Sequence, residues 1–386
     1  MGIEVCNEAI ELLRDSSKLY YFIELIEVLE RLAKEYEFCL RKTERWEEIK
    51  ALQAYLHEKK AWRDVLVELY TEQKLSPYME NFCYLYWGME SYCIGDVIKQ
   101  RRQMFGITKE QLCEGICSVK TLTRIEHRKT KTQMAIIREL FGRLGLCAEY
   151  IRAKVITSNY KVLELAENCS WYQNNRKVED CDRCLHELEQ RLCMDIPQNK
   201  QFIMVNYLLL RLKQKYISKE EFVKQMLEVM EYTVPLENIL GKERIFLSRD
   251  ESTIVYNIGI RLDNSYMEIV RKICEQYEAD IDIHSHMRRY ELLMTGIISY
   301  DGDRGNYELS DTLSNNLLKK SLICRRAHVL PVVIYNNLWN SQQRGLCKSE
   351  DVVYQETLKK CIILSVIGKN ENLANFYEQK LLSCDN

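Results

Sequence analysis

The sequence predicts an all-α protein in which a compact basic segment lies between an N-terminal helical domain and a C-terminal array of helical repeats. Only 4 prolines and 14 glycines punctuate the 386 residues, too few for the turns of a β-sandwich or barrel. Apolar residues recur at the three- and four-residue spacing of amphipathic helices. Helix-capping residues cluster between Ile94 and Leu144. We therefore expect three domains, at 1–91, 92–147 and 148–386.

Residues 1–91 are predicted to form four or five amphipathic helices. Over 19–33 the expected buried stripe comprises Phe22, Leu25, Ile26, Leu29 and Leu32. Further helices are predicted over 45–57, 61–72 and 78–88. The last of these contains Tyr84, Tyr86 and Trp87. Because aromatic side chains mainly supply buried area, this helix is expected to be a packing surface rather than a ligand site.

The segment from Ile94 to Leu144 has the punctuation of a helix-turn-helix. Gly106 is placed to end one helix, Thr108 and Gln111 have the spacing of a capping box, and Ser118 can cap the following helix. Residues 94–147 hold 11 basic and 5 acidic residues, a net charge of +6, so the remainder of the chain carries -8 of the total of -2. A charge cluster is commonly a solvated face. Here it coincides with capping signals and inward apolar positions, which favours binding to double-stranded DNA.

In a helix-turn-helix, the second helix enters the major groove and the first crosses the DNA backbone. If Ser118 caps this recognition helix, the candidate base-reading residues are Val119, Lys120, Thr121, Thr123 and Arg124. Lysine and arginine can bond to guanine O6 and N7, and threonine or valine can contact a thymine methyl group. The candidate phosphate contacts, at the start of the preceding helix and in the following loop, are Lys109, Arg128, Lys129 and Lys131.

Residues 148–386 alternate helices with short breaks. The predicted helix pairs are 161–168 with 178–192, 201–212 with 219–230, 252–262 with 266–277, 285–300 with 308–322, and 327–339 with 352–366. Similar dipeptides at Tyr256, Thr295 and Tyr335 are separated by 39 and then 40 residues. This period is typical of stacked tetratricopeptide-like repeats, although most of their consensus letters are missing. We expect a degenerate helical solenoid.

A solenoid of this kind leaves a concave groove, lined by the first helix of each pair, that suits an extended peptide. The candidate peptide-binding residues on these first helices are Asn206, Asn257, Asn336 and Asn337. An asparagine amide both donates and accepts, so it can pair with a peptide backbone whatever the peptide's sequence. The alternative, of equal weight for each residue, is a buried asparagine bonded to a neighbouring helix.

The run Gly115-Ile-Cys-Ser-Val-Lys-Thr-Leu-Thr-Arg-Ile-Glu126 resembles a signature of the phage-repressor-like (XRE) domains in peptide-responsive regulators called RRNPP, from Gram-positive bacteria. The resemblance covers 94–147 through this motif and 148–386 through architecture. It implies a tetratricopeptide-like array that binds a re-imported signalling peptide and dimerises. It also implies base reading by Lys120, Thr121 and Arg124, and peptide-holding helices at Asn257 and Asn336.

The chain departs from this family in two places. About 90 residues precede the predicted DNA-binding domain, which usually comes first. The turn after the recognition helix, commonly Glu-Asn-Gly-Lys, is Glu126-His-Arg-Lys129 here. Without the glycine, a left-handed residue in this turn must be His127 or Arg128, at some energetic cost.

Motifs for catalysis, cofactors or metals are not indicated. The sequence has no G-x-S-x-G, Walker, G-x-G-x-x-G or H-E-x-x-H motif. Cys181 and Cys184, with His186 nearby, lack a second ligand pair at zinc spacing. His284 and His286, two residues apart, face different sides of a predicted helix. We expect neither an enzyme nor a metalloprotein.

Composition also bears on location. The 16 cysteines are spread through amphipathic sequence with no signal peptide before them, which favours a reducing compartment. No run approaches the roughly 18 apolar residues of a membrane span. We expect a cytoplasmic protein without a membrane partner.

Together these patterns are interpreted as a cytoplasmic transcriptional regulator of the quorum-sensing type, switched by a short peptide. A homodimer on an inverted-repeat operator is expected, because a single helix-turn-helix reads too few base pairs and half-sites about 34 Å apart supply specificity. The alternative is a protein-interaction adaptor in which the helix-turn-helix is only structural.

Overall fold

In the computed structural model, the regular elements are helices, as the sequence predicts. The structure describes residues 2–79, 94–127, 129–130, 133–146, 155–157, 159–239, 245–262, 264–279 and 287–384. Contacts divide the chain into two compact units, one formed by Met1–Gly88 with Ile298–Asn386 and the other by Met89–Ile297. The functional division at 91 and 147 is a different partition and stays a prediction.

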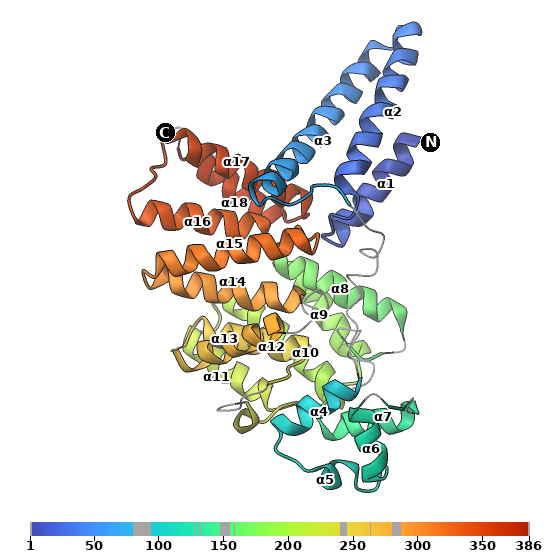
Figure 1. Ribbon diagram of the computed structural model, residues 1–386, viewed down its shortest axis with the longest axis vertical. Helices are drawn as coiled ribbons and strands as arrows, with labels where there is room; N and C mark the ends of the chain where they lie inside the picture. Colours follow the sequence, from blue (N-terminus) through green and yellow to red (C-terminus); the bar gives the residue numbers. More distant parts are fainter. Residues whose placement is uncertain are drawn as a thin grey trace. The chain divides into compact units, whose positions relative to one another are not determined.

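The unit Met89–Ile297 begins with the four short helices of the helix-turn-helix domain (Figure 1). These are α4 (Ile94–Met104), α5 (Lys109–Cys113), α6 (Val119–Glu126) and α7 (Met134–Arg143). Their shared core consists of Val97, Ile98, Leu112, Cys113, Leu122, Ile125, Ile137, Leu140, Phe141, Leu144 and Leu146. The sequence predicts seven inward positions, and six of them are in this core: Leu112, Leu122, Ile125, Ile137, Leu140 and Leu144. Ile116 is the exception, because it is only partly buried.

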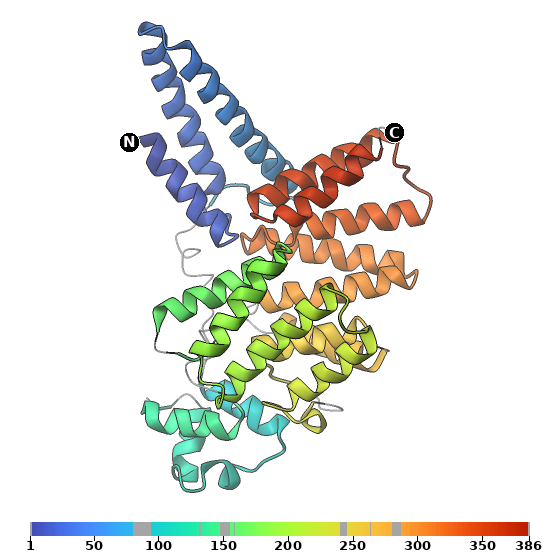
Figure 2. The same cartoon turned by 180° about the vertical axis from the view of Figure 1, so that it is seen from behind.

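Helical pairs follow in the same unit (Figure 2). They are α8 (Tyr160–Asn174), α9 (Val178–Arg191), α10 (Pro197–Lys213), α11 (Lys219–Met230), α12 (Arg249–Gly259) and α13 (Asn264–Ala279), with a 3-10 turn at Leu236–Asn238 before α12. From α8 to α13, each helix packs against the next one along the chain. Packing between neighbours in sequence is the organisation of a solenoid, so the predicted repeat architecture is confirmed for this unit.

The helices of the other unit's C-terminal part are also paired. They are α15 (Tyr307–Ile323), α16 (Leu330–Gln343), α17 (Val352–Ile367) and α18 (Glu371–Leu382), again packed in chain order. Helix α14 (Met287–Asp303) spans the division between the two units. The recurring dipeptides at Tyr256, Thr295 and Tyr335 lie on α12, α14 and α16, the first helices of their pairs.

The N-terminal helices belong to this same unit. They are α1 (Gly2–Asp15), α2 (Phe22–Lys42) and α3 (Trp46–Glu72), and both views show α2 and α3 as a long antiparallel pair. Helix α3 packs against α17, and Lys360 Nζ lies 2.7 Å from Glu68 Oε1. The hydroxyl of Tyr70 donates to the carbonyl of Leu322 at 3.2 Å. The two ends of the chain therefore share one core.

Arg325, which follows α15, binds the segment after α3 to the C-terminal helices. Its side chain is 7% exposed and lies over the ring of Tyr70, 4.5 Å from the centroid. It donates, at 2.8 to 2.9 Å, to the carbonyl oxygens of Ser76, Pro77 and Tyr78. One guanidinium thus donates hydrogen bonds to the carbonyl oxygens of three consecutive residues that lie outside any helix.

Two predictions for the N-terminal helices are corrected. The helices predicted over 45–57 and 61–72 are one helix, α3, because the sequence between them contains no glycine or proline and Lys59 packs over the ring of Trp62 at 3.4 Å. The buried face of α2 also differs slightly: Ile23 and Ala33 are buried, whereas Leu25 and Leu32 are only half-buried. The helix predicted over 78–88 lies almost wholly outside the described residues, as do His284 and His286.

Candidate nucleic-acid and peptide interfaces

Side-chain caps fix where the helices of the helix-turn-helix domain begin. Thr108 Oγ1 accepts from Gln111 N at 3.2 Å, and Gln111 Oε1 accepts from Thr108 N at 2.8 Å, which completes the predicted capping box of α5. Ser118 Oγ accepts from Thr121 N at 3.1 Å and starts α6. Both caps pair backbone N–H groups that a helix leaves unsatisfied at its first turn.

The recognition helix α6 is held close to α4 by backbone contact. A Cβ atom on Gly95 of α4 would lie 2.1 Å from the carbonyl oxygen of Ile125. No side chain fits in that space, so glycine is required for the two helices to approach this closely. Leu122 and Ile125 are buried in the core beneath α6. The opposite face of α6 is therefore fixed in its outward direction.

That outward face carries the predicted base-reading residues. Val119, Lys120 and Arg124 are exposed, whereas Thr121 and Thr123 are half-buried. The hydroxyl of Thr121 lies 2.9 Å from Ser118 Oγ, and Thr123 Oγ1 accepts from Lys109 Nζ at 3.2 Å. The exposed cations and Val119 can reach a base edge directly. To contact a base, Thr121 and Thr123 would have to give up these hydrogen bonds or use their methyl groups instead.

At the end of α6, the buried carboxylate of Glu126 pairs with two of the cations counted in this segment. Its side chain is 1% exposed and accepts from Arg102 Nε at 2.7 Å and Arg102 Nη2 at 3.2 Å. Lys109 Nζ lies 3.6 Å from Glu126 Oε2. Arg101 is fully buried as well, paired with Glu251 of α12. Glu126 is already counted in the net charge of +6, whereas Glu251 lies outside the segment, so the buried Arg101 is the cation that the count wrongly leaves available to DNA.

The predicted phosphate contacts are only partly described. Lys129 is exposed in the loop after α6, and Lys109 has a half-buried side chain at the start of α5. Arg128 and Lys131 lie outside the described residues. In the turn after α6, His127 has φ -98, so it is not the left-handed residue. Its Nδ1 atom lies 2.7 Å from the carbonyl oxygen of Thr123 and so contacts its own helix.

Two of the predicted peptide-binding asparagines lie in the unit Met89–Ile297. Asn206 of α10 and Asn257 of α12 are buried, and each amide donates at 2.8 Å to the carbonyl one turn earlier, of Phe202 and Thr253 respectively. Arg261 Nη1 also donates to Asn257 Oδ1 at 3.0 Å. A peptide would therefore have to use the remaining hydrogen-bonding capacity of each amide or displace a partner.

The other two asparagines lie on α16 and face α15. Asn336 Nδ2 donates to Ser310 Oγ at 2.9 Å and to Ser314 Oγ at 3.0 Å. Asn337 Nδ2 donates to Asn315 Oδ1 at 2.8 Å, and Asn337 Oδ1 is buried with no hydrogen-bond partner among the described residues. The bonds of Asn336 are those of an amide joining two helices. The free acceptor of Asn337 is a position where a donor from a ligand could bind.

The cysteine pair on α9 points into the core. Cys181 and Cys184 are buried in a cluster that also contains Cys169 of α8, whereas His186 is exposed and lies edge-on to the ring of Tyr207. Among the described residues, no three or more His, Cys, Asp or Glu side chains are arranged to hold a metal. Nor does any described helix have the length and hydropathy needed to cross a membrane.

Sequence reasoning missed the polar network that joins the helix-turn-helix domain to the repeats. Ser248 and Glu251 form a capping box at the start of α12, which therefore begins three residues before the predicted helix. The Ser-x-x-Glu spacing was a readable signal for this cap. The pairing of Arg101 with Glu251, 150 residues away, has no local signature.

Comparison with known proteins gives matches among solved structures only. No family model matches the chain, and no curated protein matches it. PlcR of Bacillus thuringiensis, in complex with the peptide PapR7 and DNA, is 16% identical with a TM-score of 0.47, covering 75% of this chain and 99% of PlcR. ComR of S. thermophilus, in complex with DNA and its signalling peptide ComS, is 16% identical with a TM-score of 0.45, covering 76% of this chain and 100% of ComR.

A third solved structure is Rgg2, the SHP pheromone receptor of Streptococcus dysgalactiae. It is 11% identical with a TM-score of 0.37, covering 75% of this chain and 99% of Rgg2. These proteins are RRNPP-type regulators, the group that the run from Gly115 to Glu126 resembles. At these identities the likeness concerns the arrangement of the helices, and the residues of this chain carry the functional proposal.

Proposed function

We propose that this protein is a sequence-specific transcriptional regulator that binds operator DNA through α6 and acts in the cytoplasm as a homodimer. The observation that carries the proposal is the outward face of α6. Three residues able to contact base edges, Val119, Lys120 and Arg124, are exposed on a capped helix whose other face is buried. A capped, firmly packed helix with exposed cations matches the requirements of a major-groove reader.

In this proposal, Lys120 and Arg124 bond to guanine, and Val119 contacts a thymine methyl group. Thr121 and Thr123 supply further contacts through their methyl groups. Lys109 and Lys129, together with Arg128 and Lys131, hold the DNA backbone. Phosphate contacts contribute affinity that falls with salt, whereas base contacts supply the discrimination between sequences.

We further propose that a short signalling peptide, bound by the repeats, controls this regulator. Asn206 and Asn257 lie on α10 and α12, and Asn336 and Asn337 lie on α16, all first helices of pairs. Asparagine amides on such helices can hold a peptide backbone independently of its side chains. If short synthetic peptides raise the melting temperature by an amount that grows with the logarithm of their concentration, Asn257→Ala and Asn336→Ala should remove that rise.

DNA binding is tested with a duplex enriched by the wild-type chain from a random pool, using fluorescence anisotropy at several salt concentrations. Lys120→Ala combined with Arg124→Ala should weaken binding at least about 30-fold, because each base contact contributes about 1 to 3 kcal/mol. Lys129→Ala should weaken all sequences equally and reduce the salt slope by about 1. Lys161→Ala, an exposed charge on α8, is the matched control and should change neither.

Unchanged affinity of the Lys120→Ala, Arg124→Ala variant for the enriched duplex would overturn the proposal. The helix-turn-helix would then be a structural module, as in the adaptor interpretation. Equal weakening on enriched and unrelated duplexes would show that these two residues contact phosphates and not bases.

A further inference from the structure

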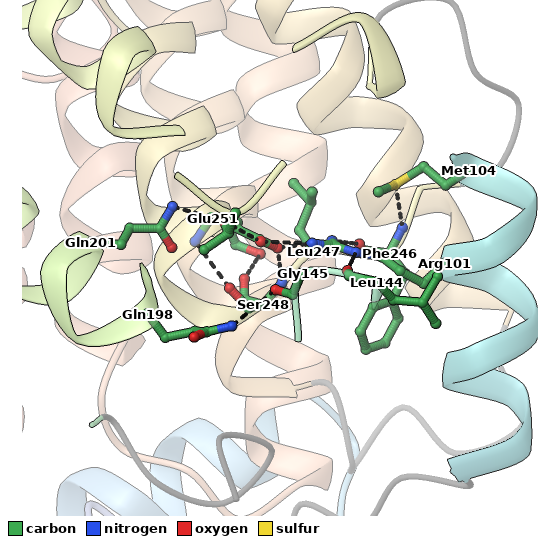
Figure 3. Close-up of polar contacts among 12 residues, drawn as sticks. Arg101, Met104, Leu144, Gly145, Gln198, Gln201, Phe246, Leu247, Ser248 and Glu251 are labelled. Atoms are coloured by element: carbon green, nitrogen blue, oxygen red, sulfur yellow. Dashed lines mark hydrogen bonds and ion pairs between the residues drawn. The ribbon is translucent and has the colours of Figure 1, made fainter. Parts of the chain in front are cut away.

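The DNA-binding domain is joined to the repeats by a buried ion pair between Arg101 of α4 and Glu251 of α12 (Figure 3). The two side chains are 0% and 1% exposed. Arg101 Nη2 donates to Glu251 Oε1 at 2.8 Å, and Arg101 Nη1 donates to Glu251 Oε2 at 3.0 Å. Two parallel bonds between a planar guanidinium and a carboxylate fix orientation as well as distance.

The remaining donors of Arg101 reach backbone on both sides of the junction. Nε donates to the carbonyl of Leu144, the C-cap of α7, at 2.9 Å. Nη1 donates to the carbonyl of Phe246, just before α12, at 2.6 Å. Arg101 therefore binds the last helix of the DNA-binding domain and the repeat segment at the same time.

Glu251 is held from the repeat side by its own bonds. Thr233 Oγ1 donates to Glu251 Oε1 at 2.7 Å, and Ser248 N donates to Glu251 Oε2 at 2.6 Å. The second of these bonds is half of the capping box of α12. The carboxylate that receives Arg101 thus also fixes the start of α12, the helix that carries Asn257.

Backbone contact beside the ion pair prevents the junction from slipping. A Cβ atom on Gly145 would lie 2.1 Å from the carbonyl oxygen of Thr233, and Gln198 Nε2 donates to the carbonyl of Gly145 at 3.1 Å. Met104 Sδ accepts from Phe246 N at 3.4 Å. At Gly145 and Thr233 the two backbones touch with no side chain between them, and the hydrogen bonds around this contact are directional. Together they hold α4 and α12 in one relative orientation.

We propose that Arg101 and Glu251 are positioning residues for operator recognition: they set the angle at which α6 is presented by the repeats, and so the half-site spacing that a dimer accepts. The inference rests on the proposed DNA-binding function. A dimer whose two α6 helices are each held at one angle fits half-sites at one separation, whereas a loosened junction lets each α6 follow half-sites at several separations. The base contacts of α6 itself are unaffected, because neither residue lies on that helix.

The test is selection of duplexes from a random pool by the full chain, followed by sequencing. Arg101→Lys keeps the charge and loses the two-bond geometry. Glu251→Gln keeps the shape and removes the charge, and Thr233→Val removes one bond to Glu251 as a milder change. The control is Glu221→Gln, the same substitution at the third position of α11, where the carboxylate is bonded to Gln225 and not to an arginine.

The wild-type chain and Glu221→Gln should enrich paired half-sites at one spacing, by about tenfold over the neighbouring spacings. Arg101→Lys and Glu251→Gln should enrich the same half-site sequence at several spacings, with Thr233→Val between them. A single unchanged spacing in these folded variants would overturn the inference, and so would a changed half-site sequence. Failure of the wild-type chain to enrich any sequence would overturn the proposed function, which is a distinguishable result.

Discussion

Gly145 lies at the junction between the helix-turn-helix domain and the repeats, where a side chain has no room. The residue has φ +64, and a Cβ atom would meet the carbonyl oxygen of Thr233 at 2.1 Å. Gly145→Ala therefore incurs a left-handed backbone cost of roughly 1 to 2 kcal/mol. It also requires a backbone shift of about 1 Å, because contacts under 3.0 Å are not found for real Cβ atoms.

That shift weakens bonds on both sides of Gly145. The bond from Gln198 contributes about 1 kcal/mol, and the charged bond from Arg101 to the neighbouring Leu144 contributes about 1.5 to 3 kcal/mol. We expect Gly145→Ala to lower the free energy of local opening by about 3 kcal/mol or more. Gly106→Ala is the matched control, since Gly106 has φ +68 with nothing within 4 Å of a Cβ atom, and should cost only about 1 kcal/mol.

Hydrogen exchange with mass detection measures both variants in the full chain, through peptides from α4 and α12. The expected difference of at least about 2 kcal/mol corresponds to roughly 30-fold faster exchange in Gly145→Ala than in Gly106→Ala. Equal exchange rates in the two variants would refute the reasoning. The backbone at Thr233 could then move away from the added Cβ atom without a measurable loss of free energy.

Further predictions concern other parts of the chain. Burial alone would raise the pKa of Glu251, but the charge and hydrogen bonds of Arg101 outweigh it and lower that pKa overall. Its stabilising contribution is therefore present at neutral pH and lost as the pH falls through the lowered folded-state value. In Glu251→Gln, the free energy of unfolding measured with urea should therefore fall less steeply as the pH is lowered than in the wild-type chain. An equally steep fall would contradict this. Lys215 has φ +61 at the end of α10, so Lys215→Gly should raise the free energy of unfolding, measured with urea, by up to about 1 kcal/mol, whereas Lys215→Ala should not; equal free energies of unfolding would exclude strain there. Arg325→Met removes the guanidinium that donates to the carbonyls of Ser76, Pro77 and Tyr78 and should destabilise the unit containing α3 by about 3 kcal/mol, seen as faster hydrogen exchange in 70–78; a loss below about 1 kcal/mol would show that water replaces the guanidinium there.

Local patterns predicted the helices well, because caps and apolar periodicity act over a few residues. Thr108, Gln111 and Ser118 identified the starts of α5 and α6, and the structure confirms both caps. The helix pairs from α8 to α17 occur where periodicity placed them, with ends shifted by a few residues. Pro197 begins α10 four residues before the predicted start, as expected of a proline in the first turn.

Long-range relations had no such signal. The charge count could not show that Arg101 is fully buried against Glu251, or that Glu126 neutralises Arg102. Several helix C-termini also lacked the glycine that usually marks a helix end in a sequence. In the turns after α3, α8, α10, α15 and α17, the left-handed residue is instead Lys74, Arg176, Lys215, Arg325 and Lys369 respectively. Basic side chains interact favourably with a helix C-terminus, which partly offsets the backbone cost. The roles of individual residues in binding DNA or peptide stay predictions.

The shared core of the chain's two ends imposes an order on biosynthesis. Arg14 of α1 donates to the carbonyl of Val366 at 2.7 Å, a separation of 352 residues, and Lys360 contacts Glu68 across 292 residues. At about 5 to 20 residues per second, the ribosome needs roughly 15 to 60 s after α3 to deliver α17. Helices α4 to α13 are complete within that interval, while the faces of α2 and α3 wait for their partners. The unit Met89–Ile297 can therefore fold first, while the N-terminal helices keep apolar surface exposed until α17 is synthesised.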